Sequence, residues 1–568
     1  MSTTLSSPEY STSMTDWGTR LERGESIIPP PKYPQTAEIA WGVMSQLKVT
    51  DVAGRPALGD ISPPWVKDLA LAFFGSLNEE TGERDLRELL LLIPKKSAKS
   101  TVAAAIMITA IVLNWRDNAE FIIVAPSVQA ASNSFRPAAA MVRADPRLNR
   151  LFRISEHQRT ITHMTTGATL KILSASVESV VGSKASLLLV DELHALAHLK
   201  DASEILSEAR GGLASRPEGA VVIITTQSSE PPCGVFKEAL QIHRDVRDGV
   251  LVDNSRLPVL YEHPREWVSS GRARTLEGVF LTNPSLGYST SKRFLEQEFT
   301  KAQSLGGTAE QEFFSKYANI EVGLNLRSDR WAGADFWEAA ADPSLTLETL
   351  IQRCDVATVG IDGGGLDDLL GLTVVGRCKS TRKWLSWSKA WAHRIALQRR
   401  KDIASRLEDF SREGDLTIVD LPGHDVEQVC QIVMQLELAG LLPEKNAIGV
   451  DPVGISAIVD QLTGPDYGLD ISRVVAVSQG YRLSGSIKTT ERALAGGTLV
   501  HAKQALMDWC VGNARIEIRG SALYVTKSQS GTAKIDPLIA MFNSVALIAL
   551  NPSGRGTLDG YLSSFTSR

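Results

Sequence analysis

The sequence predicts an α/β protein built from two domains. In its first half, short apolar runs rich in β-branched residues alternate with helical stretches: FIIVAP at Phe121, LLLVDE at Leu187 and AVVIITT at Ala220. Such runs are typical of strands buried on both faces of a mostly parallel sheet. A second set of strand-like runs, again mixed with helices, begins after residue 350. With 568 residues, the chain is also too long for one compact core.

The composition excludes several classes of protein. Hydrophobic residues at 43% and charged residues at 22% are typical of a folded globular chain and not of a disordered or fibrous one. The formal net charge of -5 argues against a uniformly basic protein that wraps nucleic acid, although a local basic channel is compatible with it. The five cysteines show no metal-ligand spacing, so we expect reduced thiols.

No membrane or secretion segment is predicted. The longest apolar run, Val102 to Leu113, is shorter than the roughly 20 residues that span a bilayer. The start of the chain lacks a basic segment followed by an apolar one. We therefore expect a cytosolic protein without a membrane partner.

Changes in composition set the expected domain boundaries. The first residues are rich in Ser and Thr and three prolines follow at 29–31, which predicts a partly flexible arm. Strand-like runs stop near residue 327, where the polar text SDRWAGADFWEAAADPS begins, and the end of the chain is rich in Gly and Ser. We expect an arm at residues 1–55, an α/β domain at 56–330, a linker at 331–350, a second α/β domain at 351–551 and a flexible tail at 552–568.

A candidate phosphate-binding loop lies in LLLLIPKKSAKST, where Lys99, Ser100 and Thr101 stand between an apolar strand and an apolar helix. A P-loop requires this context, because backbone N–H groups at a helix start cradle phosphates, a lysine reaches their oxygens and a hydroxyl binds Mg²⁺. The match is imperfect, since Ile93 and Ala98 stand where the usual pattern has Gly. Taken alone, KKSAKST is also compatible with a basic surface turn.

Two later strand ends carry polar groups that suit the same chemistry. LLLVDE ends with Asp191, which would hold Mg²⁺, and Glu192, which would polarise the attacking water. IITTQ places Thr225, Thr226 and Gln227 where a γ-phosphate sensor would lie. A solvated acidic turn and an ordinary strand exit are the respective alternatives, but the loop and the two carboxylates in this order predict an ATPase.

The second domain carries aspartates at the ends of separate elements. Asp362 ends a strand-like run in TVGIDGGG, Asp451 follows another in IGVDPVG, and Asp536 precedes an apolar helix in KIDPLIA. Asp367 and Asp368 follow the first of them. Carboxylates converging from separate elements can hold two divalent ions against a phosphodiester, and hard oxygen ligands favour Mg²⁺ or Mn²⁺. A single strand-end aspartate is more often a cap or a turn residue.

Neighbouring charged residues leave alternatives open. Asp420, which ends LTIVD, is the main rival for a ligand role, and we interpret it as a turn residue before Pro422. Lys527 and Lys534 flank the last aspartate motif and could contact the scissile strand, with a solvated hairpin as the simpler interpretation.

The strings PKKSAKS, FIIVAPS, LLLVDELH and IITTQ, in this order, resemble the ATPase half of tailed-phage large terminases. The resemblance implies a P-loop NTPase domain in which TTQ couples hydrolysis to DNA movement. It also implies that ATP is bound by the loop residues and the strand-end carboxylate: Lys95, Lys96, Ser97, Ala98, Lys99, Ser100, Thr101 and Asp191. The adenine motif of that family reads Pro-Trp-Gln, but this chain has Pro64-Trp65-Val66.

A ring motor of this kind also needs an arginine that acts on a neighbouring subunit's nucleotide. Arg210 and Arg216, just before the TTQ strand, are the candidates for this arginine finger. Each could equally be a surface arginine.

The second half resembles the RNase H-like nuclease of the same family, through AIGVDPVG, GTAKIDPLIAMFNSVAL and the stretch that carries His501, Trp509 and Asn513. The resemblance implies a C-terminal RNase H-like α/β nuclease domain. Its implied metal ligands and catalytic carboxylates are Asp362, Asp451 and Asp536, with Asp368, or Asp367 in its place, as a further ligand.

Over about residues 60 to 550, the resemblance implies a large terminase subunit that uses ATP to move viral double-stranded DNA into the procapsid and a two-metal endonuclease to cut concatemers. It implies Mg²⁺ or Mn²⁺ at both sites. Its implied partners are viral DNA, a small terminase subunit and the procapsid's portal protein, on which large subunits form a ring in the host cytoplasm, outside the mature virion.

Two other hypotheses remain open from the residues. One is a helicase-like ATPase with an inactive RNase H-like domain, suggested by the Gly-rich GIDGGG. The other is a DNA-binding scaffold with a decayed P-loop, suggested by Ala98.

Overall fold

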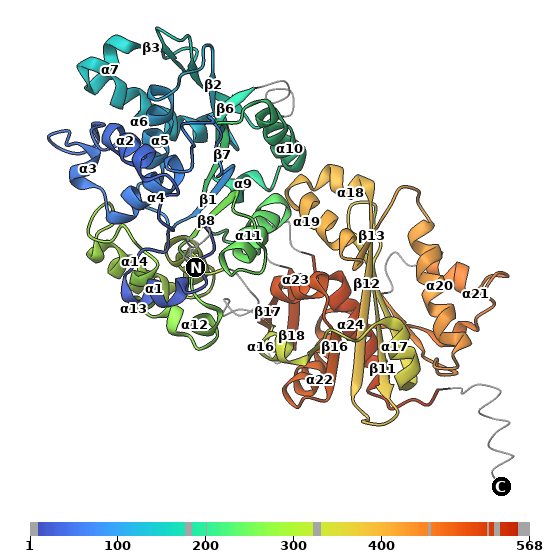
Figure 1. The fold of residues 1–568 in the computed structure, drawn as a ribbon. Coiled ribbons are helices and arrows are strands. Elements are labelled where there is room, and N and C mark those ends of the chain that lie inside the picture. Colours follow the sequence, from blue (N-terminus) through green and yellow to red (C-terminus); the bar gives the residue numbers. More distant parts are fainter. Residues whose placement is uncertain are drawn as a thin grey trace, which may run out of the picture. The chain divides into compact units, whose positions relative to one another are not determined.

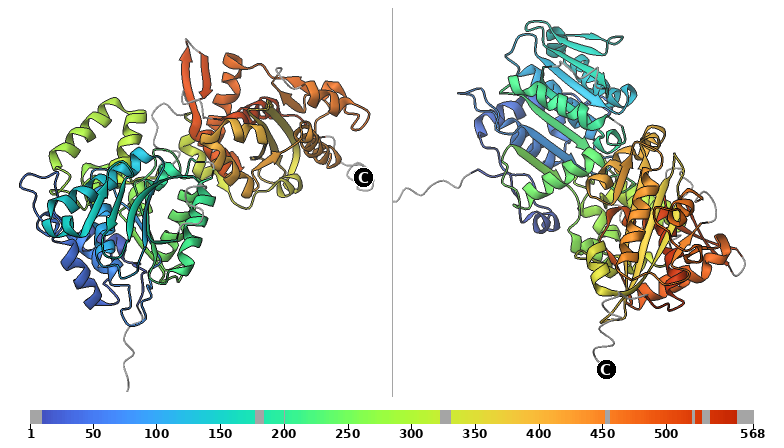
Figure 2. Two further views of the ribbon diagram at one scale, coloured as in Figure 1. Left: turned by 90° about the horizontal axis from the view of Figure 1, so that it is seen from above. Right: turned by 90° about the vertical axis from the view of Figure 1, so that its right-hand side faces the viewer.

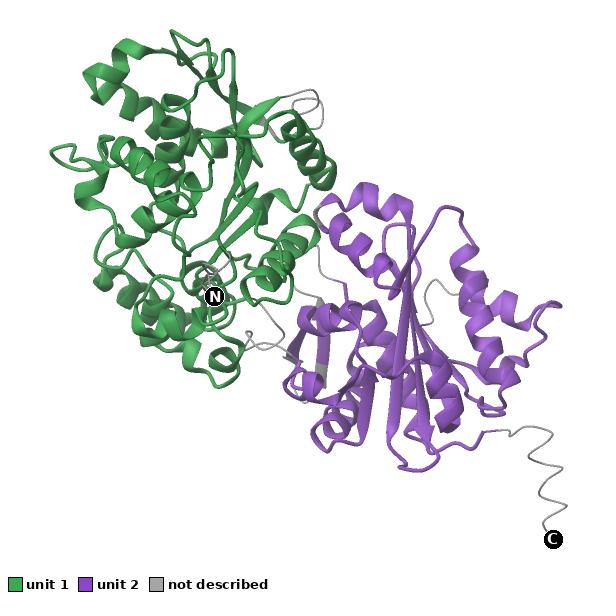
Figure 3. Ribbon diagram, viewed as in Figure 1, with its two compact units in different colours: residues 1–322 green, residues 323–568 purple. Residues whose placement is uncertain are grey.

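The computed structural model describes residues 10–176, 184–199, 201–321, 331–451, 456–519, 522–527 and 534–554. The chain divides into two compact units, residues 1–322 and residues 323–568 (Figure 3). Over the described ranges, no helix is both long and apolar enough to cross a bilayer.

A mostly parallel eight-stranded sheet forms the centre of the first unit (Figure 1). Its strand order is β3-β4-β5-β2-β6-β7-β1-β8, and β3–β4 and β4–β5 are antiparallel pairs at one edge. The strands are β1 (Glu88–Leu92), β2 (Glu120–Ala125), β3 (Phe152–Ser155), β4 (Thr160–His163), β5 (Thr169–Ser174), β6 (Ala185–Asp191), β7 (Ala220–Thr225) and β8 (Arg256–Leu260). The predicted α/β class of the first domain is confirmed.

Helices cover both faces of this sheet because its central strands are apolar on both sides (Figure 1). Leu89 and Leu91 of β1 pack into the layer of α2, α4, α5 and α6, whereas Leu90 and Leu92 pack into that of α9, α10 and α11. The helices of the unit are α1 (Trp17–Arg23), α2 (Pro34–Met44), α3 (Leu58–Ile61), α4 (Pro64–Phe74), α5 (Lys99–Val112), α6 (Val128–Ala144), α7 (Pro146–Leu151), α9 (Leu193–Leu196), α10 (Ala202–Gly212), α11 (Gly234–Arg247), α12 (Arg265–Ser269), α13 (Leu276–Leu281), α14 (Lys292–Leu305) and α15 (Gly307–Ala318).

The N-terminal segment differs from the expected flexible arm. From residue 10 onward it lies against the first unit: the Met14 N–H donates to the Arg247 carbonyl (2.9 Å), and Leu21, Ile28 and Met44 are buried in the core. Short helices and turns give no long periodic pattern, so a segment of this kind looks irregular in sequence while it still buries apolar side chains. Residues 1–9 lie outside the described part.

The second unit is built on another eight-stranded sheet, with the order β15-β14-β10-β11-β12-β16-β9 and β13 beside β12. β10, β11 and β12 are antiparallel neighbours, and β14 runs parallel to β10. The strands are β9 (Ala341–Asp342), β10 (Cys354–Gly363), β11 (Leu369–Cys378), β12 (Trp384–His393), β13 (Leu416–Val419), β14 (Ile448–Val450), β15 (Val474–Ala476) and β16 (Leu499–Ala502). A separate hairpin, β17 (Ala514–Arg519) and β18 (Ala522–Lys527), projects from the body of the unit (Figure 2).

Helices again pack on both faces of the main sheet, α17, α20 and α21 on one and α19, α22, α23 and α24 on the other. The helices are α16 (Ala334–Trp337), α17 (Leu347–Arg353), α18 (Arg394–Arg399), α19 (Lys401–Arg412), α20 (His424–Leu438), α21 (Ser456–Thr463), α22 (Ser484–Ala495), α23 (Ala505–Asn513) and α24 (Asp536–Ile548). The second domain is thus α/β, as predicted, and its sheet is mixed because it contains both parallel and antiparallel strand pairs.

Residues 331–350, expected as a linker, are part of the second unit. Trp331 and Trp337 are fully buried there, and Trp331 contacts Phe542 of α24 edge to face, with ring centroids 5.2 Å apart. Two large aromatic side chains stabilise a core strongly when buried, although the polar residues around them suggest an exposed segment. Residues 322–330 lie outside the described part.

Helix α24 lies unusually close to the sheet because glycines face it. A Cβ added at Gly360 would lie 1.8 Å from the Ala540 carbonyl oxygen, and one at Gly371 would lie 2.6 Å from the Pro537 nitrogen. The Asn543 amide donates to the Ile361 carbonyl (3.0 Å), which fixes the helix along β10. The first residue of α24 is therefore held against the ends of β10 and β11.

We expect Gly360→Ala to destabilise the second unit by about 2–3 kcal/mol, because its Cβ overlaps backbone that cannot move without shifting the helix. Scanning calorimetry of the full chain measures this. The matched control is Gly485→Ala in α22, where an added Cβ meets nothing within 4 Å and stability should stay the same or rise slightly. Equal melting of the two variants would contradict the close approach of α24.

Candidate functional sites

The candidate phosphate loop follows β1 and leads into α5, which begins at Lys99. Lys96 (φ 73°) and Ala98 (φ 56°) both adopt left-handed backbone conformations. This conformation costs a residue with a side chain about 1–2 kcal/mol, which explains why the usual pattern has Gly at the position of Ala98. The loop therefore keeps a left-handed turn before the helix despite the substitution.

Hydrogen bonds from distant segments hold this loop. The Lys96 carbonyl accepts from the hydroxyls of Ser289 and Thr290, each at 2.8 Å. The Lys95 N–H donates to the carbonyl of Lys316 in the last turn of α15 (2.7 Å). These contacts offset the backbone strain and give the loop its shape before any ligand binds.

The interior of the loop suits an anionic ligand. Ser97 Oγ is buried and has no hydrogen-bond partner among the residues that the structure describes. Lys99 is 8% exposed; burial, the largest influence, lowers the pKa of Lys99 to about 8, and the charges of Lys316 and Lys95 act in the same direction. A buried ammonium, an unpartnered hydroxyl and a helix start are together what a phosphate group satisfies.

The remaining loop residues surround that interior. Lys95 and Lys96 are exposed, whereas Ala98, Ser100 and Thr101 are half-buried, the latter two in the first turn of α5. The role of each of these residues toward a phosphate stays a prediction.

Strand register brings the carboxylates to the same edge of the sheet as the loop. β7 lies between β1 and β6, with Leu92 opposite Thr225 and Ile224 opposite Asp191. The Glu192 N–H donates to the Ile224 carbonyl (2.9 Å). Asp191, Glu192 and Thr225 therefore follow neighbouring strand ends beside the phosphate loop.

Asp191 and Glu192 have opposite electrostatic environments. Burial raises the pKa of Asp191 to about 6, although the Ser134 hydroxyl donates to its carboxylate (2.7 Å). Burial alone would also raise the pKa of Glu192, but His194 and the charge of Lys99 outweigh it and lower this pKa to about 2. Glu192 is thus ionised at neutral pH, and a nearby cation would stabilise the ionised form of Asp191.

Two residues that the motifs did not reveal complete the constellation. His194 Nδ1 lies 3.1 Å from Glu192 Oε2 and 3.1 Å from Thr225 Oγ1. Its Nε2 lies 3.2 Å from Lys316 Nζ, which also donates to the Gln227 carbonyl (3.2 Å). An ammonium only donates, so Nε2 accepts and the proton of the neutral ring is on Nδ1, which donates to Thr225 Oγ1. His194 comes two residues after Glu192, within the run LLLVDELH, but nothing in the sequence marks Lys316.

The strand-end residues Thr225, Thr226 and Gln227 are all buried. Thr225 Oγ1 accepts from the His194 N–H (3.2 Å), and the Gln227 N–H donates to Asn319 Oδ1 just after α15 (3.1 Å). The predicted coupling residues therefore contact the segment after Glu192 on one side and the end of α15 on the other.

Neither candidate arginine finger lies at the nucleotide site of its own chain. Arg210 forms an ion pair with Glu88 (2.8 Å), the first residue of β1, whereas the phosphate loop follows the last. Arg216 lies before the start of β7, where its carbonyl accepts from the Arg87 guanidinium (2.8 Å). Arg210 stabilises the buried carboxylate of Glu88, and a role of either arginine in a neighbouring subunit stays a prediction.

The predicted adenine motif is largely buried. Trp65 Nε1 donates to Ser285 Oγ (3.0 Å), and its ring contacts that of Tyr261 at 6.3 Å between centroids. Val66 is 1% exposed and packs in the core. Val66 therefore supplies none of the polar contacts that a glutamine at this position could make.

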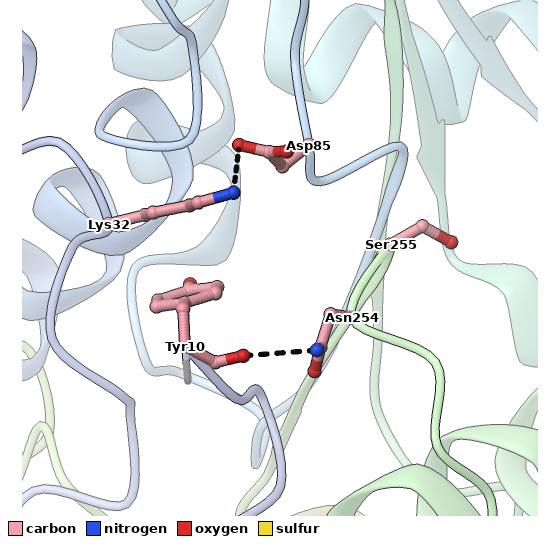
Figure 4. Close-up of a pocket in the computed structure, with 5 residues that line it drawn as sticks. All are labelled: Tyr10, Lys32, Asp85, Asn254 and Ser255. Carbon is pink, nitrogen blue, oxygen red and sulfur yellow. Dashed lines mark hydrogen bonds and ion pairs between the residues drawn. The ribbon is translucent and has the colours of Figure 1, made fainter. Parts of the chain in front are cut away.

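A cavity of about 280 Å³ lies at the other edge of the sheet (Figure 4). Lys32 and Asp85 form an ion pair across it (3.1 Å), and Asn254 Nδ2 donates to the Tyr10 carbonyl (3.0 Å). Asp85 precedes β1 and Ser255 precedes β8, so this cavity lies at the starts of these two strands. The phosphate loop follows the opposite end of β1. The cavity is therefore not the nucleotide site.

In the second unit, three predicted aspartates gather at one sheet edge. Asp362 lies near the end of β10, and Asp451 follows β14, where Val450 is opposite Ile361. Asp536 begins α24, and a Cβ at Gly363 would lie only 3.3 Å from Asp536 Oδ1. Asp362 and Asp536 are both buried, 8% and 4% exposed. Tight packing of α24 thus brings the third aspartate next to the first.

Cations accompany the additional aspartates. Arg400 pairs with Asp367 (3.2 Å), and the buried ammonium of Lys534 pairs with Asp368 and donates to the Asp367 carbonyl (3.3 Å). Within the described ranges, no group of three or more His, Cys, Asp or Glu side chains is arranged to hold a metal ion. Carboxylate oxygens are the donors that Mg²⁺ and Mn²⁺ prefer, and Asp368 would have to leave Lys534 to bind such an ion.

The other predicted residues take peripheral or supporting places. Asp420 is exposed and pairs with Arg394, in agreement with a turn role. The His501 ring stacks on Trp337 with centroids 3.7 Å apart, and Asn513 Nδ2 donates to the Lys534 carbonyl (3.1 Å). The side chain of Lys527 lies outside the described part.

Comparisons with known proteins agree for both halves. Residues 64–239 match the family described as terminase large subunit, ATPase domain, and residues 279–551 match terminase large subunit, endonuclease domain. The chain is 22% identical over 494 residues to the terminase large subunit of Enterobacteria phage HK97, which covers 85% of this chain and 89% of that protein. It is 23% identical over 402 residues to protein YmfN of Escherichia coli strain K12, covering 68% and 82%. The crystal structure of the HK97 large terminase is similar with a TM-score of 0.46 and 19% identity, covering 90% of this chain and 99% of that one.

The environment of Asp191 predicts a pH-dependent stability. The pKa of Asp191 is raised from 3.8 to about 6 in the folded state. Between these two pH values the folded protein keeps the Asp191 proton while the unfolded chain has lost it, so the folded state loses stability as the pH rises and Asp191 ionises. Without Mg²⁺, the stability of wild type relative to Asp191→Asn should fall by roughly 1–2 kcal/mol from about pH 5 to about pH 8. Calorimetry in chelator measures this, with the exposed Glu204→Gln as the control for a lost charge. A difference independent of pH would contradict it.

Proposed function

Because this chain belongs to the large-subunit family of phage terminases, whose domains are a packaging ATPase and an endonuclease, we propose that named residues of its two units carry these activities. We assign the ATPase domain to residues 56–330, with residues 1–55 packed against it from residue 10 onward. We assign the nuclease domain to residues 351–551, with 331–350 packed into its core and 552–568 following it. Family membership favours this function over a helicase-like ATPase or a DNA-binding scaffold.

ATP would bind at the phosphate loop, from Lys95 to Thr101. The observation that carries this assignment is the buried ammonium of Lys99 beside the unpartnered hydroxyl of Ser97 at the start of α5. The exposed Lys95 and Lys96 would meet the outer phosphate oxygens, and Ala98 would present the loop's backbone. The ammonium groups of Lys95, Lys96 and Lys99 repel one another, and the negative charge of a bound phosphate would attract all three.

Mg²⁺ at this site would be held by the Ser100 hydroxyl and by Asp191, whose carboxylate is destabilised in its ionised form until a cation is near. When bound, the ion neutralises charge on the β- and γ-phosphates. Glu192 stays ionised, so it can accept a hydrogen bond from water and orient it for attack. The coupling of ATP hydrolysis to DNA movement is assigned to the residues at the end of β7, Thr225, Thr226 and Gln227. This strand lies between β1, which leads to the phosphate loop, and β6, which ends in Asp191.

DNA cleavage would occur where Asp362, Asp451 and Asp536 gather. We propose them as ligands of Mg²⁺ or Mn²⁺, with Asp368, or Asp367 in its place, completing the set. When bound, two such ions stabilise the attacking and leaving oxygens of a phosphodiester. The burial of Asp362 and Asp536 and the close packing of α24 would make the carboxylate frame rigid, and Lys534, which pairs with Asp368, would balance part of its charge.

Large terminase subunits bind DNA and power packaging. We infer for this chain the partners that such a role requires: viral double-stranded DNA, a small terminase subunit and the procapsid's portal protein, on which copies would form a ring. An arginine from the neighbouring copy, Arg210 or Arg216, would then complete each nucleotide site. The host cytoplasm is the proposed place of this activity.

ATP turnover tests the first site. Lys99→Ala and Glu192→Gln should each lower the turnover number more than about 100-fold, because one removes phosphate contact and the other removes water activation. Glu192→Gln should keep its affinity for a non-hydrolysable ATP analogue, whereas Lys99→Ala should lose it. The matched control is the exposed Glu204→Gln in α10, which should retain wild-type turnover. Wild-type turnover in Lys99→Ala would overturn the assignment.

Plasmid cleavage tests the second site. With Mg²⁺ or Mn²⁺, the wild type should linearise and degrade plasmid DNA, and Asp362→Ala and Asp451→Ala should each be at least about 100-fold slower because a metal ligand is lost. The control is Asp420→Ala, which removes an exposed aspartate paired with Arg394 and should cut like the wild type. A folded wild type that cuts with neither metal would favour a silent second domain.

A further inference from the structure

Lys316 joins three parts of the nucleotide site, although it lies far from all of them in the sequence. Its carbonyl accepts from the Lys95 N–H of the phosphate loop (2.7 Å). Its ammonium donates to the Gln227 carbonyl, beyond the end of β7, and to His194 Nε2, both at 3.2 Å. One residue of α15 thus contacts the loop, the coupling segment and the residue beside Glu192.

The position of this ammonium is unfavourable without a functional reason. It is half-buried, and burial lowers the pKa of Lys316, with the charge of Lys95 acting in the same direction. Its own charge in turn disfavours the ammonium of Lys99. A methionine would fill similar space without this repulsion, so packing alone does not explain a lysine here.

Lys316 determines how His194 faces Glu192. Because an ammonium has no lone pair, it forces Nε2 of the neutral imidazole to accept and places the ring proton on Nδ1. Nδ1 hydrogen-bonds to Thr225 Oγ1 and also lies 3.1 Å from Glu192 Oε2, so the N–H side of the ring borders the group that is proposed to activate water. Without Lys316, either tautomer could form and the ring could turn.

We propose that Lys316 and His194 are positioning residues of the ATPase, which together hold the Glu192 carboxylate in the orientation that water activation requires. The inference rests on the proposed function of Glu192. The chain of contacts runs from Lys316 Nζ to His194 Nε2 and from His194 Nδ1 to Glu192 Oε2. Thr225 Oγ1, also 3.1 Å from Nδ1, keeps the imidazole beside the end of β7.

The test compares steady-state ATP hydrolysis by the full-length chain with its affinity for a fluorescent, non-hydrolysable ATP analogue. Lys316→Ala and His194→Ala should each lower kcat about 10- to 100-fold, the usual effect of removing a residue that orients a catalytic group. KM and analogue affinity should change less than about threefold, because neither residue is assigned to hold the phosphates.

Conservative and double variants separate positioning from a structural role. Lys316→Arg and His194→Gln should partly restore kcat, since arginine keeps donors and a glutamine amide keeps one donor and one acceptor. The double variant Lys316→Ala/His194→Ala should be little slower than the slower single variant, because both act through one chain of contacts. A loss merely due to unfolding would lower the melting temperature and would not follow this pattern.

A backbone measurement gives an independent check. Truncating the Lys316 side chain leaves its carbonyl in place, so hydrogen exchange at the Lys95 amide should match that of the wild type.

The matched control for the kcat measurement is Lys301→Ala on α14. The Lys301 side chain is 66% exposed, and its truncation should leave kcat unchanged.

Three results would overturn the inference. They are a wild-type kcat in Lys316→Ala, a loss of analogue affinity as large as the loss of kcat, and independent effects of the two single variants. The first leaves the proposed ATP site intact as long as Lys99→Ala is inactive. Activity in Lys99→Ala would instead reject the site itself.

Discussion

The parallel register of β1, β7 and β6 is the constraint on which the chemistry of the first unit depends. It sets Leu92 opposite Thr225 and Ile224 opposite Asp191, so the phosphate loop, the coupling residues and both carboxylates emerge side by side. Open parallel sheets place ligands at the carboxyl ends of their strands for this reason. The second unit has a similar arrangement, since Asp362 lies near the end of β10 and Asp451 follows its parallel neighbour β14.

The nucleotide site contains strain and charge that a ligand would relieve. Ala98 is left-handed, Lys99 is a buried ammonium and Asp191 is a buried carboxylate with a raised pKa. Each is unfavourable by itself. The surrounding fold holds the loop through the hydroxyls of Ser289 and Thr290, which donate to the Lys96 carbonyl, and the Ser134 hydroxyl donates to Asp191. Functional sites commonly hold such groups because their environment is complementary to the ligand and not to the empty protein.

The sequence was sufficient where a feature is local and insufficient where it depends on distant partners. Apolar runs that end in polar residues predicted β1, β6 and β7 and the place of Lys99, Asp191 and Thr225, because a buried strand and its exit are encoded together. Lys316 could not be found this way, since it reaches His194 only after α15 folds back onto the sheet. For the same reason the buried Trp331 looked like part of a linker, and Arg210 gave no sign of its pairing with Glu88.

The place of α24 in the chain affects when the nuclease can form. This helix follows every strand of the second unit that the structure describes, yet it carries Asp536 and packs directly on Gly360 and Gly371. During synthesis on the ribosome, the first unit and the sheet of the second emerge before it, and domains fold in that order. A nascent chain therefore has its ATPase half before its carboxylate cluster is complete.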